Sequence, residues 1–301
     1  MNLSVNIGNI MWHYSFSDSA DIYKKAGFTA CDYSVMRMIE DGNIFNTDGY
    51  REFAESERRV ADEKGFPITQ THAPFAFKKE LFLDPIAFEE IIFKRVARSI
   101  EISGILGAKT VIVHPLTYLH YPDHVEELFE LNMRYYRRLI PYAKDAGVKI
   151  AIENMFTVDP LRKFIVGSTC ADPNELVRYV DTLDSEEIVA CLDIGHVALP
   201  LHEYTAVDAI RILGHDRLKA LHVHDNDYRA DRHVLPYLGS FDWMAIAKAL
   251  GEIDYDGDFT YEVAGSLILN RDPGFIPIGA KFMADVGKHI MAEIDRNRPN
   301  V

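Results

Sequence analysis

The feature of this chain that most restricts its fold is a repeated junction, in which an amphipathic stretch ends at a glycine and a short apolar run follows. The glycines of these junctions are Gly27, Gly65, Gly107, Gly147 and Gly251. A glycine at such a place is typical of the left-handed cap that ends a helix. The repeat therefore predicts helices that alternate with strands, as in an α/β protein with a parallel sheet.

Eight short β-rich runs fit this alternation. They cover residues 3–10, 28–34, 67–72, 109–114, 148–153, 188–194, 218–224 and 259–264. Amphipathic stretches that would form helices include 87–106, 124–146 and 278–294. An open doubly wound sheet is the alternative, but the first run is followed by no Gly-rich phosphate fingerprint. We therefore predict a single (β/α)₈ TIM barrel as one domain over residues 1–301.

The composition restricts the class of protein and its partners. With 48% hydrophobic and 26% charged residues, the chain is expected to be soluble and globular. No apolar run approaches the length of a membrane span, so we expect a cytoplasmic protein without a membrane role. The formal charge of −14 repels polyanions, which argues against a nucleic-acid partner. Cys31, Cys170 and Cys191 are too scattered for a disulfide framework and are expected to be core residues.

Side chains of the types that commonly bind metals stand where most of the predicted strands end. They are His72, His114, Glu153, Asp193 with His196, His222 with His224, and Glu262. In a TIM barrel the active site lies at the carboxyl ends of the strands. A lone buried histidine is more often a hydrogen-bonded core residue, but buried carboxylates are costly unless paired or bound to a cation. The set predicts one shared divalent metal, and its oxygen and imidazole ligands suit Mn²⁺, Mg²⁺, Co²⁺ or Zn²⁺.

The same motifs resemble those of the xylose-isomerase-like barrel superfamily, which includes sugar and sugar-phosphate isomerases and epimerases, over nearly the whole chain. The resemblance implies that one metal is bound by Glu153, Asp193, His222 and Glu262, and that His196 binds substrate. His222 and His224 face the same side of one strand. We favour His222 as the ligand because its spacing to Asp225 resembles the His-x-x-Asp pattern of the family. His224 then supports the site or contacts the substrate.

The chemistry that this resemblance implies is isomerisation or epimerisation of a carbohydrate, namely a sugar, a sugar phosphate or a keto-polyol. A metal that chelates a carbonyl and a neighbouring hydroxyl would stabilise an enediolate, and Glu153 and Glu262 could exchange the proton, in an order that the sequence does not fix. Residues expected to contact the substrate are His72, His114, His13, Trp12, Phe75, Phe77 and, on a later loop, Arg229. Self-association into a homo-oligomer is left open.

Other functions on the same scaffold compete with this interpretation. Abasic-site endonucleases of the superfamily bind three zinc ions through nine ligands, and counterparts here would include Asp231 and His233 as additional ligands. The negative charge and the lack of a basic cluster oppose this multinuclear phosphoester hydrolase. A dehydratase or lyase and a non-catalytic sugar-binding protein are further alternatives, and the fold cannot separate them. The pair Asp242 and Trp243 is expected to be a helix N-cap followed by a core aromatic.

Overall fold

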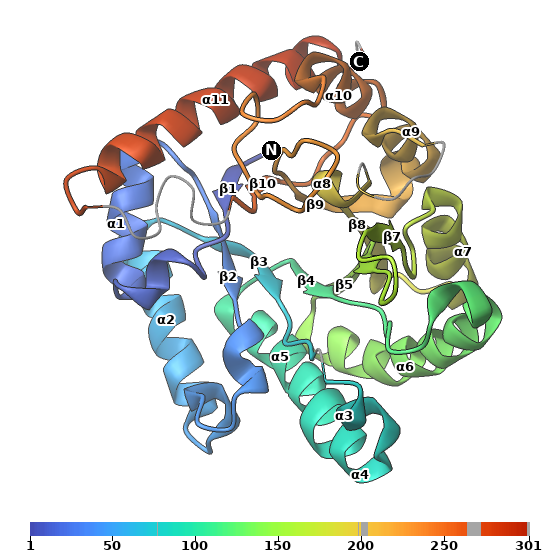
Figure 1. Ribbon diagram of the computed structural model, residues 1–301. Helices are drawn as coiled ribbons and strands as arrows, with labels where there is room; N and C mark the ends of the chain where they lie inside the picture. Colours follow the sequence, from blue (N-terminus) through green and yellow to red (C-terminus); the bar gives the residue numbers. More distant parts are fainter. Residues whose placement is uncertain (77, 198, 200–203, 264–271, 300–301) are drawn as a thin grey trace.

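The computed structural model describes the chain except for residues 77, 198, 200–203, 264–271 and 300–301. Eight parallel strands form a ring that is surrounded by helices (Figure 1). The strands are β1 (Leu3–Val5), β2 (Cys31–Ser34), β3 (Ile68–His72), β4 (Thr110–Val113), β5 (Lys149–Glu153), β8 (Ile188–Asp193), β9 (Leu218–His222) and β10 (Phe259–Tyr261). Each lies within a predicted run, so the predicted α/β barrel is confirmed.

The ring closes through backbone pairing at both of its seams. Strands β2, β3, β4, β5, β8 and β9 pair in that order, and β1 pairs with β10. Isolated bridges join Asn6 to Asp32 and Val223 to Tyr261. The backbone N–H of Asn6 also donates to the carbonyl of Tyr261 over 2.7 Å. Because the sheet has no open edge, every strand end lies on one of two rims.

Long helices cover the outside of the barrel. They are α1 (Phe16–Ala26), α2 (Tyr50–Lys64), α5 (Lys94–Leu106), α6 (Val125–Ala146), α7 (Pro173–Leu183), α9 (Ala206–Arg217), α10 (Trp243–Glu252) and α11 (Ile276–Arg296). Shorter helical segments are η1 (Ile10–Trp12), η2 (Met36–Ile39), η3 (Ile44–Asn46), α3 (Glu80–Leu83), α4 (Pro85–Ala87), η4 (Phe88–Phe93), η5 (Tyr121–Asp123) and α8 (Ile194–Val197). Among the described helices, none is long and apolar enough to cross a lipid bilayer.

The glycine junctions behave as predicted in four of the five cases. Gly27, Gly65, Gly107 and Gly147 end their helices with positive φ angles. The prediction for Gly251 is wrong, because this residue lies inside α10. A Cβ atom there would stand 2.5 Å from the carbonyl oxygen of Ile294, so the glycine is needed for close packing of α10 on α11.

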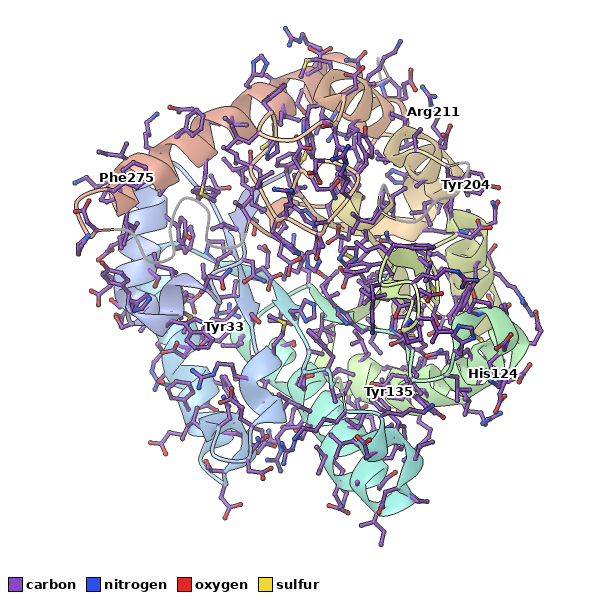
Figure 2. All side chains as sticks on the ribbon, viewed as in Figure 1. Tyr33, His124, Tyr135, Tyr204, Arg211 and Phe275 are labelled. Carbon is purple, nitrogen blue, oxygen red and sulfur yellow. The ribbon has the colours of Figure 1, made fainter. Side chains whose placement is uncertain are left out.

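Two apolar regions fill the structure. The larger lies between the strands and the helices, where side chains crowd the space around the ring (Figure 2). The smaller is a cluster of five side chains on the central strands, namely Ile112, Ala151, Val189, Cys191 and Ala220. The three cysteines are buried and free, as predicted. Trp243 is also buried, and Asp242 caps α10 by accepting the N–H of Ala245.

Several boundaries differ from the prediction. The first strand was expected to reach residue 10, but it ends at Val5, and η1 follows. The helix predicted over 87–106 begins as the π-helix η4 before it becomes α5. An antiparallel hairpin of β6 (Phe156–Val158) and β7 (Ile165–Gly167), absent from the prediction, stands after β5. The hairpin borders the cavity described below.

Candidate metal centre and active site

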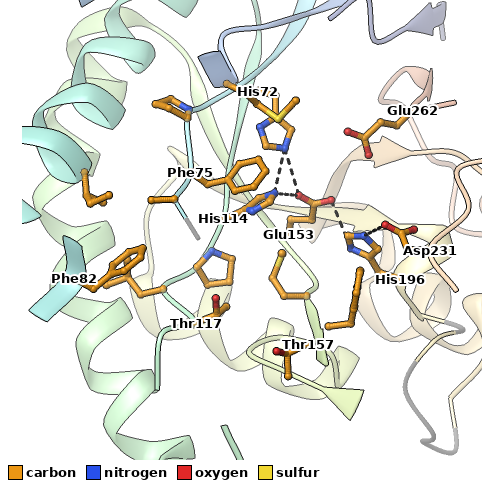
Figure 3. A pocket seen from close by; sticks show the side chains of 18 of the residues that line it. His72, Phe75, Phe82, His114, Thr117, Glu153, Thr157, His196, Asp231 and Glu262 are labelled. Carbon is orange, nitrogen blue, oxygen red and sulfur yellow. Dashed lines mark hydrogen bonds and ion pairs between the residues drawn. The ribbon is translucent and has the colours of Figure 1, made fainter. Parts of the chain in front are cut away.

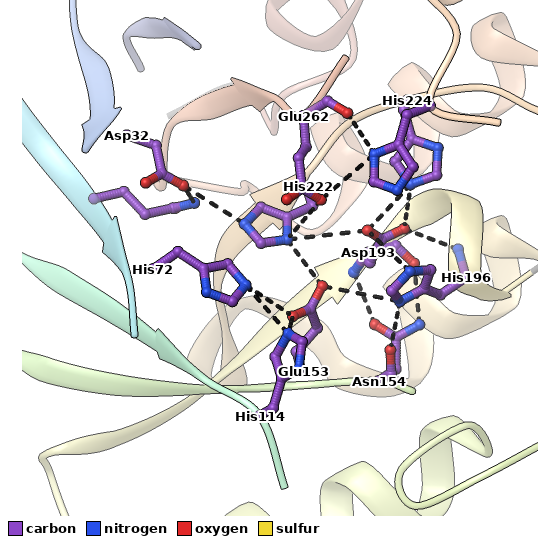
Figure 4. A network of polar contacts seen from close by, with 12 residues as sticks. Asp32, His72, His114, Glu153, Asn154, Asp193, His196, His222, His224 and Glu262 are labelled. Atoms are coloured by element: carbon purple, nitrogen blue, oxygen red, sulfur yellow. Dashed lines mark hydrogen bonds and ion pairs between the residues drawn. The ribbon is translucent and has the colours of Figure 1, made fainter. Parts of the chain in front are cut away.

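The parallel strands bring the predicted ligands to one rim of the barrel. Glu153, Asp193 and His222 are the last residues of β5, β8 and β9, and Glu262 follows β10 directly. The register pairs Asp193 with His222 across neighbouring strands. Inward-facing positions alternate along a strand, so these side chains point into the ring. The four residues offer ligand atoms that lie within 4.8 Å of one another (Figure 4).

This first cluster is arranged around Nδ1 of His222. That atom lies 2.8 Å from Oε1 of Glu153, 3.4 Å from Oε2 of Glu262 and 3.9 Å from Oδ2 of Asp193. Burial alone would lower the pKa of His222, but the negative charges of Glu262 and Glu153 outweigh burial and raise it. Three carboxylates around one imidazole repel one another unless a positive charge stands among them. The donor set therefore fits a divalent cation.

A second cluster shares Glu153 with the first. Nε2 of His114 lies 2.8 Å from Oε2 of Glu153 and 3.1 Å from Nε2 of His72. His72 is the last residue of β3, and His114 follows β4 directly. Burial lowers the pKa of His114 despite the nearby carboxylate. Glu153 thus directs one oxygen toward each cluster, and His72, His114 and Glu153 form another group with metal-ligand spacing.

A third cluster lies toward the rim and comprises His196, His224, Asp231 and His233. Asp231 Oδ2 lies 2.8 Å from Nε2 of His233 and 3.7 Å from Nε2 of His196. Burial would lower the pKa of both histidines, but neighbouring carboxylates raise it to about 10 for His196 and about 9 for His233. The additional ligands considered for a multinuclear site thus meet in space.

His224 joins the first cluster to the third. Its Nε2 atom lies 2.9 Å from Oδ1 of Asp193 and 3.6 Å from Oδ1 of Asp231. The ring is fully buried and stacks on His233 with centroids 3.9 Å apart. Gly195 makes room for it, because a Cβ at Gly195 would stand 1.9 Å from the His224 ring. Of the two roles considered for His224, this geometry favours support of the site over contact with substrate.

Two further side chains hold the ligand set in place and were missed as such. Asn154 accepts the backbone N–H of Asp193 over 2.7 Å and donates to the carbonyl of Asp193 over 3.0 Å. Asp32 on β2 is fully buried, and its Oδ2 lies 3.6 Å from Nε2 of His222. Gln70 donates to the same oxygen over 3.0 Å. A charged residue on an otherwise buried strand is the signal that could have identified Asp32.

A cavity of about 570 Å³ opens beside the three clusters (Figure 3). Its polar wall consists of His72, His114, Glu153, His196, Asp231, His233 and Glu262. The structure thus brings together most of the predicted site residues. Phe75 also lines the cavity, whereas Phe77 lies outside the described residues.

Three predicted substrate contacts stand away from the cavity wall. Trp12 is 63% exposed and lies beneath the guanidinium of Arg37. His13 and Arg229 are exposed, and neither lines the cavity. The structure does not bring these three side chains to the clusters, so their contacts with substrate stay predictions.

The fold and the strand-end ligand clusters together define a barrel of the class that carries its active site on the carboxyl rim, with candidate metal sites there. The chain belongs to the family of xylose isomerase-like TIM barrels, whose family model matches residues 20–284.

Comparisons with individual proteins agree with this family. The chain is 28% identical to an uncharacterized protein of Methanocaldococcus jannaschii over 197 residues, or 64% of this chain and 62% of that protein. It is 26% identical to a D-psicose 3-epimerase of Enterocloster bolteae over 250 residues, or 82% and 76% of the two chains. The crystal structure of a D-tagatose 3-epimerase-like protein matches with a TM-score of 0.75 at 19% identity, covering 98% and 99%. The likeness to this crystal structure shows that the two chains share a fold.

Proposed function

We propose that this protein is a divalent-metal-dependent isomerase or epimerase that moves a proton next to the carbonyl of a keto sugar or keto-polyol. The observation that carries the proposal is the meeting of Glu153, Asp193, His222 and Glu262 beside one cavity. The similarity to a D-psicose 3-epimerase supports the substrate class. The fold alone would not, because unrelated reactions occur on this scaffold.

The residues present fit the metal that this chemistry needs. Glu153, Asp193 and His222 are buried, and carboxylates in such a place require a compensating positive charge. The four first-cluster residues would hold one divalent ion. When bound, this ion would supply Lewis-acid stabilisation of negative charge that develops on substrate oxygens.

The two glutamates differ in their surroundings, which suggests how they would divide the proton transfer. The Glu262 side chain is 17% exposed and borders the cavity, so a substrate can approach it. The Glu153 side chain is 1% exposed and lies within 2.8 Å of both His114 and His222. We assign Glu262 to the first abstraction and Glu153 to the opposite face of the substrate carbon. A carboxylate on each face can invert that carbon by removing and returning a proton.

The test is hydrogen exchange with solvent. The metal-loaded protein, incubated with a panel of ketoses in deuterated water, should place deuterium at the carbon next to the carbonyl. Glu262→Gln should slow this exchange by about 100-fold or more, as expected when a general base is removed. Glu252→Gln, a change at an exposed residue of α10, is the control. Absence of exchange across ketoses and ketose phosphates, with metal content verified, would contradict the proposal.

One observation favours a second candidate, a multinuclear phosphoester hydrolase. The three clusters described above each have metal-ligand spacing and lie beside one cavity, and Glu153 belongs to two of them. Metal analysis of protein purified without added metal separates the candidates, when it is combined with assays of phosphomonoester and phosphodiester cleavage. One ion per chain without cleavage supports the isomerase. Three zinc ions with metal-dependent cleavage would establish the hydrolase.

A further inference from the structure

The cavity has an apolar side that the proposed proton transfer does not use. Its walls there include Phe75, Phe82, Ile92, Leu116 and Tyr135. Figure 3 shows Phe82 across the cavity from Glu262, with the polar clusters on the side of Glu262. The cavity is thus divided between a polar half at the strand ends and an apolar half under α3 and η4.

Ring stacking holds the aromatic side chains of the apolar half in place. The Phe82 ring on α3 stacks on Tyr118 with centroids 5.1 Å apart, and the Phe75 ring stacks on His114 with centroids 4.3 Å apart. Ile92 comes from the π-helix η4, a kind of irregularity that is frequent at functional sites. Because the Phe75 ring stacks on His114 of the second cluster, Phe75 marks the boundary between the two halves.

The size and charge of the cavity restrict what can fill it. A volume of about 570 Å³ lies in the range of pockets that enclose drug-sized ligands, which exceed a bare monosaccharide. No lysine or arginine stands among the described residues that line it. A phosphate on the apolar side would stand away from the histidines and carboxylates of the clusters and would have no such partner, and a buried dianion is costly without one. An apolar group would instead gain by leaving water.

We infer that the substrate is an unphosphorylated keto sugar joined to an apolar, preferably aromatic, group. The sugar occupies the polar half, and the apolar group lies against Phe82, Ile92 and Tyr135. This inference rests on the proposed function for the sugar part of the substrate, because the three clusters are what would bind its carbonyl and hydroxyl groups. A glycosidic bond occupies the anomeric carbon, so the reacting carbonyl must stand elsewhere on the ring, for example at C3.

The inference is tested first by binding alone, which needs no reaction. Phenyl β-D-glucoside and methyl β-D-glucoside, titrated calorimetrically into the Mn²⁺-loaded protein, present the same sugar with and without a ring. The phenyl compound should bind at least about tenfold more tightly, as expected for burial of an aromatic group. Equal affinities of the two compounds would overturn the inference.

Variants on one short helix then locate the contact. Phe82→Ala should remove most of the preference for the phenyl compound, while the affinity for the methyl compound changes less than about twofold. Leu83→Ala is the matched control, because Leu83 is the next residue on α3, is 60% exposed and does not line the cavity. Loss of the preference in both variants, or in neither, would show that the ring does not bind at this wall.

Solvent exchange separates this inference from the proposed function. Phenyl and methyl 3-keto-β-D-glucosides, incubated with the metal-loaded protein in deuterated water, should both acquire deuterium next to the carbonyl, with a lower KM for the phenyl compound. Exchange with equal KM values would overturn the apolar subsite and leave the isomerase chemistry intact. A phenyl preference in binding without exchange on any carbonyl compound would retain the subsite and overturn the proposed function.

Discussion

The carboxylate of Asp225 accepts the indole N–H of Trp243 over 2.8 Å, and both side chains are buried. The same carboxylate accepts backbone N–H groups from four residues of the chain after β9, namely Asn226, Tyr237, Ser240 and Phe241. Gly239 allows this approach, because a Cβ there would stand 2.2 Å from Asp225 Oδ1. One carboxylate therefore organises the loop that carries Asp231 and His233.

Replacement of that carboxylate by an amide should open the loop. In Asp225→Asn, an NH₂ group would face N–H donors, and buried donors would lose their acceptor. We expect the free energy of unfolding to fall by about 3 kcal/mol, measured by urea denaturation. Asp242→Asn is the control, because aspartate and asparagine cap helices about equally well. Equal stability of the two variants would show that Asp225 does not hold the loop.

Removal of one ligand tests the first cluster. Asp193→Asn keeps the volume of the side chain but removes a negative charge from the candidate metal site. We expect metal affinity to fall by more than about 100-fold, because even residues that only support ligands cost 10-fold to 100-fold. Elemental analysis after dialysis measures the bound ion. Asp48→Asn, at an exposed position, should retain it, and full occupancy in Asp193→Asn would mean that the ligands are assigned wrongly.

A single methyl group tests the role of His224. In Gly195→Ala the new Cβ would meet the His224 ring, so the ring must move away from Asp193. We expect weaker metal binding and a loss of about 1–3 kcal/mol of stability, the usual cost of overpacking. Gly42→Ala is the control, because a Cβ at Gly42 meets no atom within 4 Å. Unchanged metal affinity in Gly195→Ala would show that the His224 contact with Asp193 is dispensable.

Much of the fold could be predicted because the barrel leaves a local signature on each strand. An apolar run followed by a ligand residue identified the ends of β5, β8 and β9 to within one or two residues. The ligands could be grouped for the same reason, since parallel strands bring their carboxyl ends together. The end of β1 could not be predicted from the apolar pattern, because Ile7 and Ile10 are buried although they follow the strand. Ile10 begins η1, and Ile7 lies in the segment that leads to it.

The parts that could not be predicted depend on packing between distant segments. Gly251 has the local sequence of a helix cap, but contact with Ile294 decides its conformation. Trp12, on η1, and Arg229, after β9, stand away from the cavity because of the paths of the segments that follow β1 and β9, which carry no periodic pattern. The apolar half of the cavity is assembled from α3, η4, α6 and the segments after β3 and β4, so no single stretch of sequence reveals it.

The charge on the histidines of the third cluster predicts how metal binding depends on pH. Carboxylates raise the pKa of His196 to about 10 and of His233 to about 9, although burial acts in the opposite direction. Both rings are therefore protonated at pH 7.5 in the metal-free protein. The stability that they contribute is fully present below about pH 6.5, the value for an unfolded histidine, and is lost as the pH rises through 9 to 10.

An ion bound by His196, Asp231 and His233 would have to displace these protons. We expect loading with Zn²⁺ at pH 7.5 to release about two protons for an ion at this cluster, and the apparent affinity to rise with pH until about pH 9 to 10. Calorimetric titrations in two buffers of different ionisation enthalpy measure the release. His233→Gln should release fewer protons than the wild type, whereas His120→Gln, an exposed change, should match it. Zinc binding in which His233→Gln releases as many protons as the wild type would mean that the ion does not reach the third cluster, because an ion that displaces the proton of His233 must add it to the solvent.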